Sequence, residues 1–241
     1  MTLLTICQNI ADATHGPRPA TIAANTNPDA QNYLRIVNKV GTKLMKVYPW
    51  NILRAEHSFT APGTETLIAA ASMPSDFDRF IPETFWNRST NNLISGPIGS
   101  TEWQGLKVMN STVPNYKFTY RGGDVLAIPT ISSSSTCAFE YVSNQWCQSS
   151  GGTGKTAFSV DTDTGILDEE LITLAATYAW LTAEGQPVQG AWQEFKDYFD
   201  TLQSNENATA NIAVTADIFG RFSRHFDGAP MASRQAYTGG S

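Results

Sequence analysis

The glycine-rich segment at residues 151–156, Gly-Gly-Thr-Gly-Lys-Thr, has residue types that could bind phosphate. In a phosphate-binding loop, backbone amides surround the phosphates and a lysine reaches the terminal one. The spacing does not fit, because the first glycine of that motif would fall at Ser149. The context does not fit either, since residues 156–160 read as a strand where the motif requires a helix. We therefore expect a flexible glycine turn, and nucleotide hydrolysis at Lys155 is the weaker alternative.

The acidic segment at residues 161–165, Asp-Thr-Asp-Thr-Gly, has the carboxylates of a calcium loop. Its glycine comes one place too early, and Ile172 stands at the twelfth position, where the calcium loop needs a glutamate. The segment therefore predicts a turn that leads into the acidic start of a helix.

Histidines, cysteines and isolated acids supply the remaining candidates for chemistry. The histidines and cysteines are His15, His57, His225, Cys7, Cys137 and Cys147. Their spacing matches neither a zinc site nor a nucleophile motif, and the cysteines are expected to be reduced thiols. Asp76 and Asp78 could serve a wall-degrading glycoside hydrolase, although isolated loop carboxylates are usually solvated surface. The sequence predicts no catalytic residue, no metal site, no cofactor and no enzyme.

Six tryptophans raise the question of stacking on sugars or bases. They are Trp50, Trp86, Trp103, Trp146, Trp180 and Trp192. Trp180 and Trp192 lie on helical faces and are expected to pack between helices. Trp86, Trp103 and the neighbouring Phe85 lie near turns in a strand-rich region. Because aromatic side chains dominate interface cores, we expect these three at a contact with another subunit or with a tail component.

Composition favours a subunit that is covered by neighbours. Of 241 residues 41% are hydrophobic, which supports a packed core, and only 16% are charged, below the roughly one quarter usual for soluble domains. A surface of hydroxyls and amides is less costly to desolvate than one of charges. The net charge of -6, without a run of basic residues, argues against tight nucleic-acid binding, yet it is compatible with a channel through which DNA slides. The first ten residues predict neither a signal peptide nor a membrane span.

Periodicity divides the chain into a helical, a strand-rich and a second helical region. Apolar residues at helical spacing predict helices from Leu3 to about Ala11 and from about Tyr33 to Val47, as an αα-hairpin. The period then changes to two, which predicts strands. The strand candidates are 53–60, 79–86, 116–120, 125–128, 137–142 and 156–160, with a hairpin turn at Gly122-Gly123 and a short helix at 100–108.

Helical spacing returns after Gly165, in one helix behind Asp168 and a second around Trp192 that could continue to Phe222. The last segment has too few large apolar residues to fold alone, so it is expected to be an arm that orders on a partner. The predicted fold class is α+β, with N- and C-terminal helical hairpins packed as a bundle, a central antiparallel β-rich insertion and an extended C-terminal arm. The predicted parts are 1–51, 52–166, 167–223 and 224–241.

Three segments carry a resemblance to a known family. Residues 74–88 and 93–104 look like a stretch that recurs in proteins encoded in phage and prophage structural clusters, and residues 2–11 resemble their N-terminal helix. The order of helices, β insertion, helices and arm is similar to the head-to-tail adaptor proteins of short-tailed phages, the tail tubular A type, and to head-completion connectors. The specific motif covers only residues 74–104 of the chain.

The resemblance implies a ring of about twelve subunits under the portal, with the β lobe toward the next tail or nozzle protein. It places the protein in the virion neck, assembled in the host cytoplasm, with DNA passing through the ring without sequence-specific binding and no membrane contact. We expect the arm to dock on the portal through Met231, Arg234 and Tyr237. The alternative is another tail component that contacts a host receptor or glycan through the β lobe.

Overall fold

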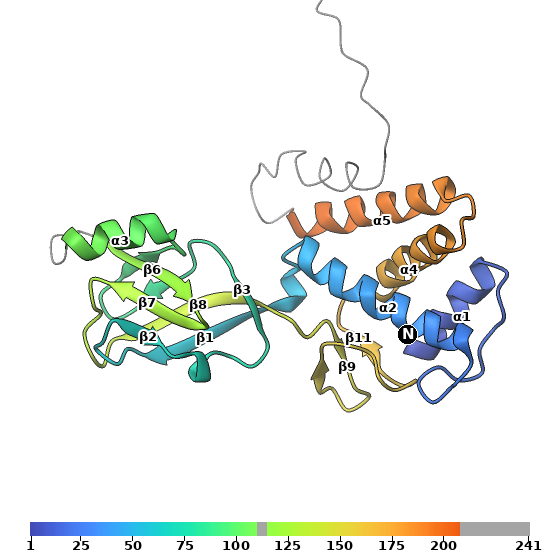
Figure 1. The fold of residues 1–241 in the computed structure, drawn as a ribbon, viewed down its shortest axis with the longest axis horizontal. Helices are drawn as coiled ribbons and strands as arrows, with labels where there is room; N and C mark the ends of the chain where they lie inside the picture. The colour runs from blue at the N-terminus through green and yellow to red at the C-terminus, as the bar shows by residue number, and fades with distance from the viewer. Residues whose placement is uncertain (110–114, 208–241) are drawn as a thin grey trace, which may run out of the picture. The chain divides into compact units, whose positions relative to one another are not determined.

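The chain folds as a mixed α+β protein, seen in a computed structural model that describes residues 1–109 and 115–207 (Figure 1). It divides into two compact units, Met1–Thr201 and Leu202–Ser241. The predicted arm at 224–241 and the continuation of the last helix to residue 223 lie outside the described residues. The α-helices are α1 (Leu3–Ala13), α2 (Pro28–Val47), α3 (Ser100–Met109), α4 (Glu169–Ala183) and α5 (Gln189–Asn207). None of these helices has the length and apolar character to cross a bilayer.

Local capping signals begin the first two helices, and α2 starts at Pro28, before the predicted Tyr33. The Thr2 hydroxyl accepts a hydrogen bond from the Thr5 amide, 3.3 Å away, at the start of α1. The Asn27 side-chain oxygen accepts one from the Asp29 amide, 2.9 Å away, at the start of α2. Pro28 fits the first turn of α2 because its missing N–H would have no helical partner there. Both predicted N-terminal helices are confirmed.

Helix α4 is the main packing partner of both N-terminal helices. The Asp168 carboxylate accepts a hydrogen bond from the Leu171 amide at 2.8 Å and caps α4, as the acidic start predicts. The Tyr33 ring of α2 stacks on the Trp180 ring of α4, with centroids 4.0 Å apart. Helices α1 and α2 also contact each other, but each packs more on α4 than on the other. A helix with buried side chains on several faces, as α4 has, is suited to this central position.

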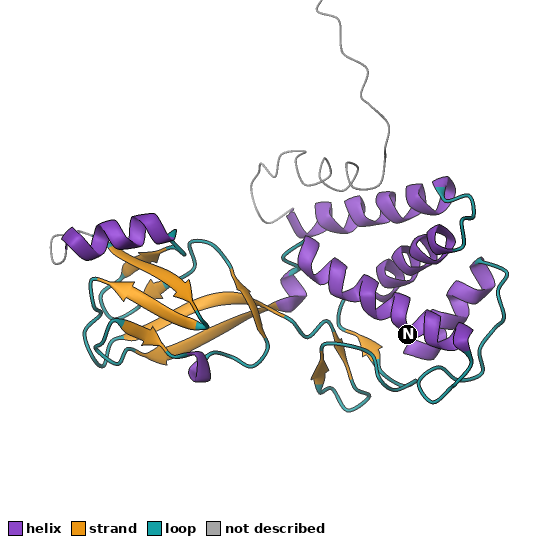
Figure 2. Cartoon of the chain, viewed as in Figure 1, coloured by secondary structure: helices purple, strands orange, loops and turns teal. Residues whose placement is uncertain are grey.

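The strands form one large curled sheet and one small one (Figure 2). The strands of the large sheet are β1 (Arg54–Thr60), β2 (Thr66–Ile68), β3 (Phe77–Phe80), β4 (Trp86–Asn87), β5 (Asn92–Ser95), β6 (Tyr116–Arg121), β7 (Asp124–Ile128) and β8 (Thr136–Ser143). Their order is β1-β8-β4-β5-β6-β7-β2, and β3, which lies off this path, also pairs with β8. The β6–β7 hairpin is confirmed, with positive φ angles at Gly122 and Gly123 in its turn.

The large sheet is not wholly antiparallel, which corrects the predicted insertion. Strands β5 and β6 pair in parallel, with Ile94 opposite Tyr116. Parallel neighbours need a crossover connection, and α3 lies in the segment between these two strands. Trp103 of α3 is fully buried, so the crossover helix is anchored by an aromatic side chain.

The segment from Phe77 to Asn87 follows β8 as an interrupted strand, whereas the sequence predicts one strand over 79–86. The Ile81 amide still donates to the Glu140 carbonyl at 3.0 Å, but Pro82 has no N–H to continue the ladder. Glu83 takes a left-handed φ of 63°, and the Thr84 hydroxyl accepts a hydrogen bond from the Glu140 amide at 3.1 Å. The interruption separates β3 from β4 and sets the direction of Trp86.

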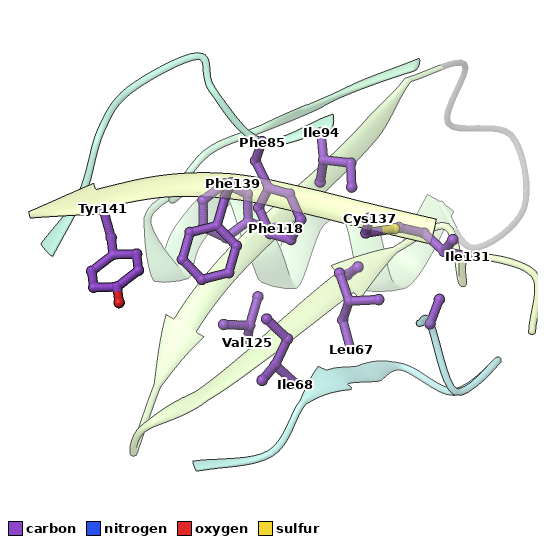
Figure 3. Packing of buried hydrophobic residues seen from close by; sticks show 12 residues of the cluster. Leu67, Ile68, Phe85, Ile94, Phe118, Val125, Ile131, Cys137, Phe139 and Tyr141 are labelled. Atoms are coloured by element: carbon purple, nitrogen blue, oxygen red, sulfur yellow. The ribbon is translucent and has the colours of Figure 1, made fainter. Parts of the chain in front are cut away.

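An aromatic core fills the β lobe, the part of the chain formed by the large sheet and α3 (Figure 3). Phe139 of β8 is 1% exposed and lies among other rings, 4.9 Å from Phe80 and 5.2 Å from Phe85 between centroids. Each such pair contributes about 0.5–1.5 kcal/mol beyond the area it buries. The lobe therefore has a hydrophobic core of its own.

The small sheet consists of β9 (Cys147–Gln148), β10 (Gly154–Lys155) and β11 (Thr164–Gly165), in the order β10-β9-β11. The predicted strand at 156–160 is wrong. Its backbone donors bond side chains instead of a neighbouring strand: the Phe158 amide donates to Asn38 of α2 at 2.8 Å, and the Val160 amide donates to Asp163 at 2.9 Å. The Trp146 ring lies against Gly41 of α2, so this segment contacts the helices.

Candidate functional site

The glycine-rich segment is a structural turn followed by a strand. The Gly152 amide donates to the Ser149 carbonyl at 2.9 Å, and β10 begins where a phosphate-binding loop would begin a helix. The Lys155 ammonium donates to the Asp163 carboxylate and to the Ser159 hydroxyl. The expectation of a turn is confirmed, and the lysine of the motif is held within its own loop.

Asp163 organises the loop between β10 and β11. It is 1% exposed and accepts hydrogen bonds from Lys155 and from the amides of Ser159 and Val160, the latter two at 2.8 and 2.9 Å. Burial opposes its charge, but these donors together hold the pKa of the Asp163 carboxyl below its usual value. Asp161 accepts from the Ala23 amide at 2.7 Å and ties the loop to the segment before α2. Both acids of the calcium-like sequence therefore bind protein donors, and the turn is confirmed.

The two isolated acids of the β lobe also have protein partners. The Tyr141 hydroxyl donates to Asp76 at 2.9 Å, and burial followed by this contact raises the pKa of Tyr141 to about 12. Asp78 pairs with Arg79 at 2.8 Å, and Arg79 also donates to the carbonyl of Tyr48 just after α2. These contacts link β3 and the residue just before it to β8 and to the end of α2.

The histidines and cysteines do not converge among the described residues. No group of three or more His, Cys, Asp or Glu side chains there could hold a metal ion. His57 lies in the β lobe against Phe139, 5.4 Å between centroids, and burial lowers its pKa. His225 lies outside the described residues. All three cysteines are buried and free, and burial raises their pKa values, to about 12 for Cys7 and Cys147 and about 11 for Cys137.

Of the three aromatic residues expected at an interface, only Trp86 is exposed. Its side chain is 43% exposed, whereas Phe85 is 2% and Trp103 is 1% exposed. Phe85 and Trp103 belong to the interior of the β lobe, so the expectation that they contact a neighbour is corrected. Phe85 faces the core because side chains alternate along a strand, and the same alternation turns Trp86 outward. Trp180 is buried between helices and Trp192 packs 5.2 Å from Tyr178, both as predicted.

The Trp86 surface is a shallow hollow of about 250 Å³ on the β lobe. We define it by the residues that line it: Glu56, Glu83, Thr84, Trp86, Arg88, Ala138, Phe139 and Glu140. Strand pairing holds Trp86 opposite Ala138 on β8, and this small neighbour leaves the indole accessible.

Charge on the Trp86 surface is acidic. Three carboxylates face one guanidinium, and Arg88 pairs with Glu56 at 2.7 Å. An exposed indole beside unpaired carboxylates favours contact with a cationic or amphipathic partner, because the indole contributes apolar area and attracts cations over its face. The surface thus has the chemistry of an interaction site.

A larger open cleft, of about 560 Å³, lies in the helical part of the chain. The end of α1, the start of α2 and the end of α4 line it, with Asp29 and Glu184 as its carboxylates and Trp180 at its wall. The chain therefore presents a hollow on its helical part as well as on its β lobe.

The residues expected in the portal-docking arm, Met231, Arg234 and Tyr237, lie outside the described residues, so their role stays a prediction. Comparison with protein-family models and with curated proteins finds no match for this chain. The contributions of Glu56 and Glu140 to the Trp86 surface could not be predicted from the sequence, because the pairing of β1 and β4 with β8 joins residues far apart in the chain.

Proposed function

We propose that the protein is a structural head-to-tail adaptor of a bacteriophage virion, a connector subunit that binds the portal and its own neighbours. In this proposal the protein is not an enzyme, and it conducts DNA without reading its sequence. It acts in the neck between capsid and tail, after assembly in the host cytoplasm.

The proposal is supported mainly by two different surfaces on one chain, one on the β lobe and one on the helices around α4. The β lobe has a core of its own and an exposed tryptophan, and the helices around α4 form a second packed region with its own cleft. A connector needs one surface for the component above and another for the component below. The exposed Trp86 supports the proposal, because tryptophan is over-represented at protein interfaces.

The polar groups that looked suited to chemistry support the same proposal. Lys155, Asp163 and Asp161 stabilise a loop, and Asp76 and Asp78 bind Tyr141 and Arg79. Because these residues stabilise the fold, no catalytic role is needed to explain why they are there.

Co-purification with the portal tests the proposal. The full chain and the portal of the same phage are co-expressed and separated by size, and the mass of the complex is measured. We expect a complex with several copies of the chain per portal ring. A chain that elutes alone, at every ratio of the two proteins, would refute the connector function.

A second candidate function is a tail component that contacts a receptor or glycan. The exposed Trp86 with flanking carboxylates favours it, because an indole stacks on sugar rings while carboxylates accept hydrogen bonds from sugar hydroxyls. Binding of the full chain to a glycan array, lost in Trp86→Ala, combined with no binding to the portal, would establish this alternative.

A further inference from the structure

Helix α2 carries a row of basic side chains on its exposed face. The row consists of Arg35, Lys39, Lys43 and Lys46, all exposed and spaced by four, four and three residues. This spacing puts them on one side of the helix, opposite Tyr33, Val37 and Leu44, which are buried.

Three members of the basic row, Arg35, Lys39 and Lys46, have no acidic residue within a turn of them on α2. Asp29, in the first turn, is the only acid in α2. No ion pair joins Arg35, Lys39 or Lys46 to a carboxylate of the described residues. Like charges four residues apart repel each other, so Arg35 and Lys39 destabilise the helix on which they stand. The helix dipole stabilises Lys46 near the C-terminus of α2, but it does not stabilise Arg35 and Lys39 in the middle of the helix.

The same face lacks the apolar groups that a protein partner would need. The exposed residues of α2 other than Pro28 are all charged or polar, and Asn32 and Thr42 add a partly exposed amide and hydroxyl beside the row. Protein interfaces concentrate energy in buried aromatic and aliphatic anchors, whereas interfaces with DNA are polar and positively charged. The composition of this face therefore fits a polyanion better than a protein surface.

We propose that the basic row of α2 contacts the phosphate backbone of double-stranded DNA. The inference rests on the proposed function, which brings DNA past each subunit. Residues one helical turn apart have Cβ atoms about 5–6 Å apart, close enough to reach successive phosphates of one strand with flexible side chains. The rest of the chain is acidic, with a total net charge of -6, which keeps the contact weak and sensitive to salt. Weak contact is what a channel needs if DNA is to pass.

The test measures DNA binding by the full chain, using fluorescence anisotropy with a fluorescein-labelled random duplex at several salt concentrations. The variant is Arg35→Gln with Lys39→Gln. The matched control removes two exposed cations from the β lobe, Arg54→Gln with Arg121→Gln. All four side chains are exposed, so both variants are expected to keep the wild-type circular dichroism spectrum.

We expect the wild type to bind weakly at low salt, and the α2 variant to lose at least about tenfold in affinity. Its plot of log affinity against log salt should be shallower by about two, since each phosphate contact contributes about 0.9 to the slope. The control should bind within about twofold of the wild type, because its charges lie outside the basic row. No DNA binding by the wild type, or equal losses in the variant and the control, would overturn the inference.

Two further readouts separate this inference from its alternatives. Binding of the basic row to labelled polyglutamate in preference to the duplex would overturn it in favour of an acidic protein partner. Portal binding is measured on the same variants. Portal binding without DNA binding defeats the DNA contact alone, and DNA binding without portal binding defeats the connector function.

Discussion

Replacement of Gly41 by alanine tests the packing of α2 on the Trp146 loop. A Cβ atom at position 41 would lie 2.3 to 2.6 Å from three ring atoms of Trp146, far inside van der Waals contact. Trp146 is fully buried, and its indole N–H donates to the Thr156 carbonyl at 2.7 Å. The ring therefore cannot move without losing this hydrogen bond and part of its packing.

The expected effect of Gly41→Ala has three parts. Overpacking costs about 1–3 kcal/mol, and loss of the indole hydrogen bond costs about 1 kcal/mol. The better helix propensity of alanine returns about 1 kcal/mol. We therefore expect the free energy of unfolding to fall by about 2 kcal/mol, measured by urea titration with tryptophan fluorescence.

Gly105→Ala in α3 is the matched control. It makes the same chemical change in a helix, but no atom lies within 4 Å of the added Cβ. The free energy of unfolding should then rise by about 0.5–1 kcal/mol from propensity alone. If Gly41→Ala were as stable as the wild type, or stabilised like the control, the close contact between α2 and Trp146 would be refuted.

Three more predictions concern the buried ion pair, the thiols and the exposed tryptophan. Lys155→Met leaves the Asp163 carboxylate buried without its cation and should lower the free energy of unfolding by about 2 kcal/mol, less than for a fully buried pair because Lys155 is partly exposed. In the wild type, the folded-state pKa of Asp163 is lowered, so its stabilisation is complete above about pH 4 and is lost as the pH falls through the folded value. The variant lacks the Lys155 contribution to that lowered pKa, so urea titrations between about pH 3 and 6 should show the stability difference between wild type and variant shrinking on acidification; a difference that does not change with pH would contradict the role of the pair. The buried cysteines should react with a thiol reagent at about pH 8 only after unfolding, because their pKa values are about 11 to 12, and rapid labelling of the native chain would contradict their burial. Trp86→Ala should change the free energy of unfolding by no more than about 0.5 kcal/mol, because its side chain is exposed, while weakening portal or tail-protein binding about 30-fold if Trp86 is an interface hot spot. Calorimetric titration against each partner checks this last expectation, and unchanged affinity for both would remove Trp86 from the interface.

The helices and the β6–β7 hairpin could be predicted because their signals are local. Thr2 and Asn27 cap the helices that follow them, and Gly122-Gly123 supplies the positive φ angles of a tight turn. These features depend on residues within a few positions of one another, which is the range that periodicity and turn chemistry describe.

The errors arose where distant residues decide the structure. Residues 156–160 alternate like a strand, but Asn38, 120 positions from Phe158, takes part in the hydrogen bonding that a strand partner would have provided. The parallel pairing of β5 with β6 depends on where α3 packs, and no local pattern reports that. Trp86 could not be separated from Phe85 until the register with β8 was known.

The basic row of α2 was missed for a different reason. The chain has no run of consecutive basic residues here, but a helix brings together cations that are three or four positions apart. The helix itself was predicted from Tyr33 to Val47, so its exposed face could have been derived from the same periodicity.

Electron cryo-microscopy of the phage neck tests the connector function most directly. We expect a ring of density directly beneath the portal, into which copies of the unit Met1–Thr201 can be fitted. Density for this chain at the tail tip, or a neck built entirely from other proteins, would contradict it.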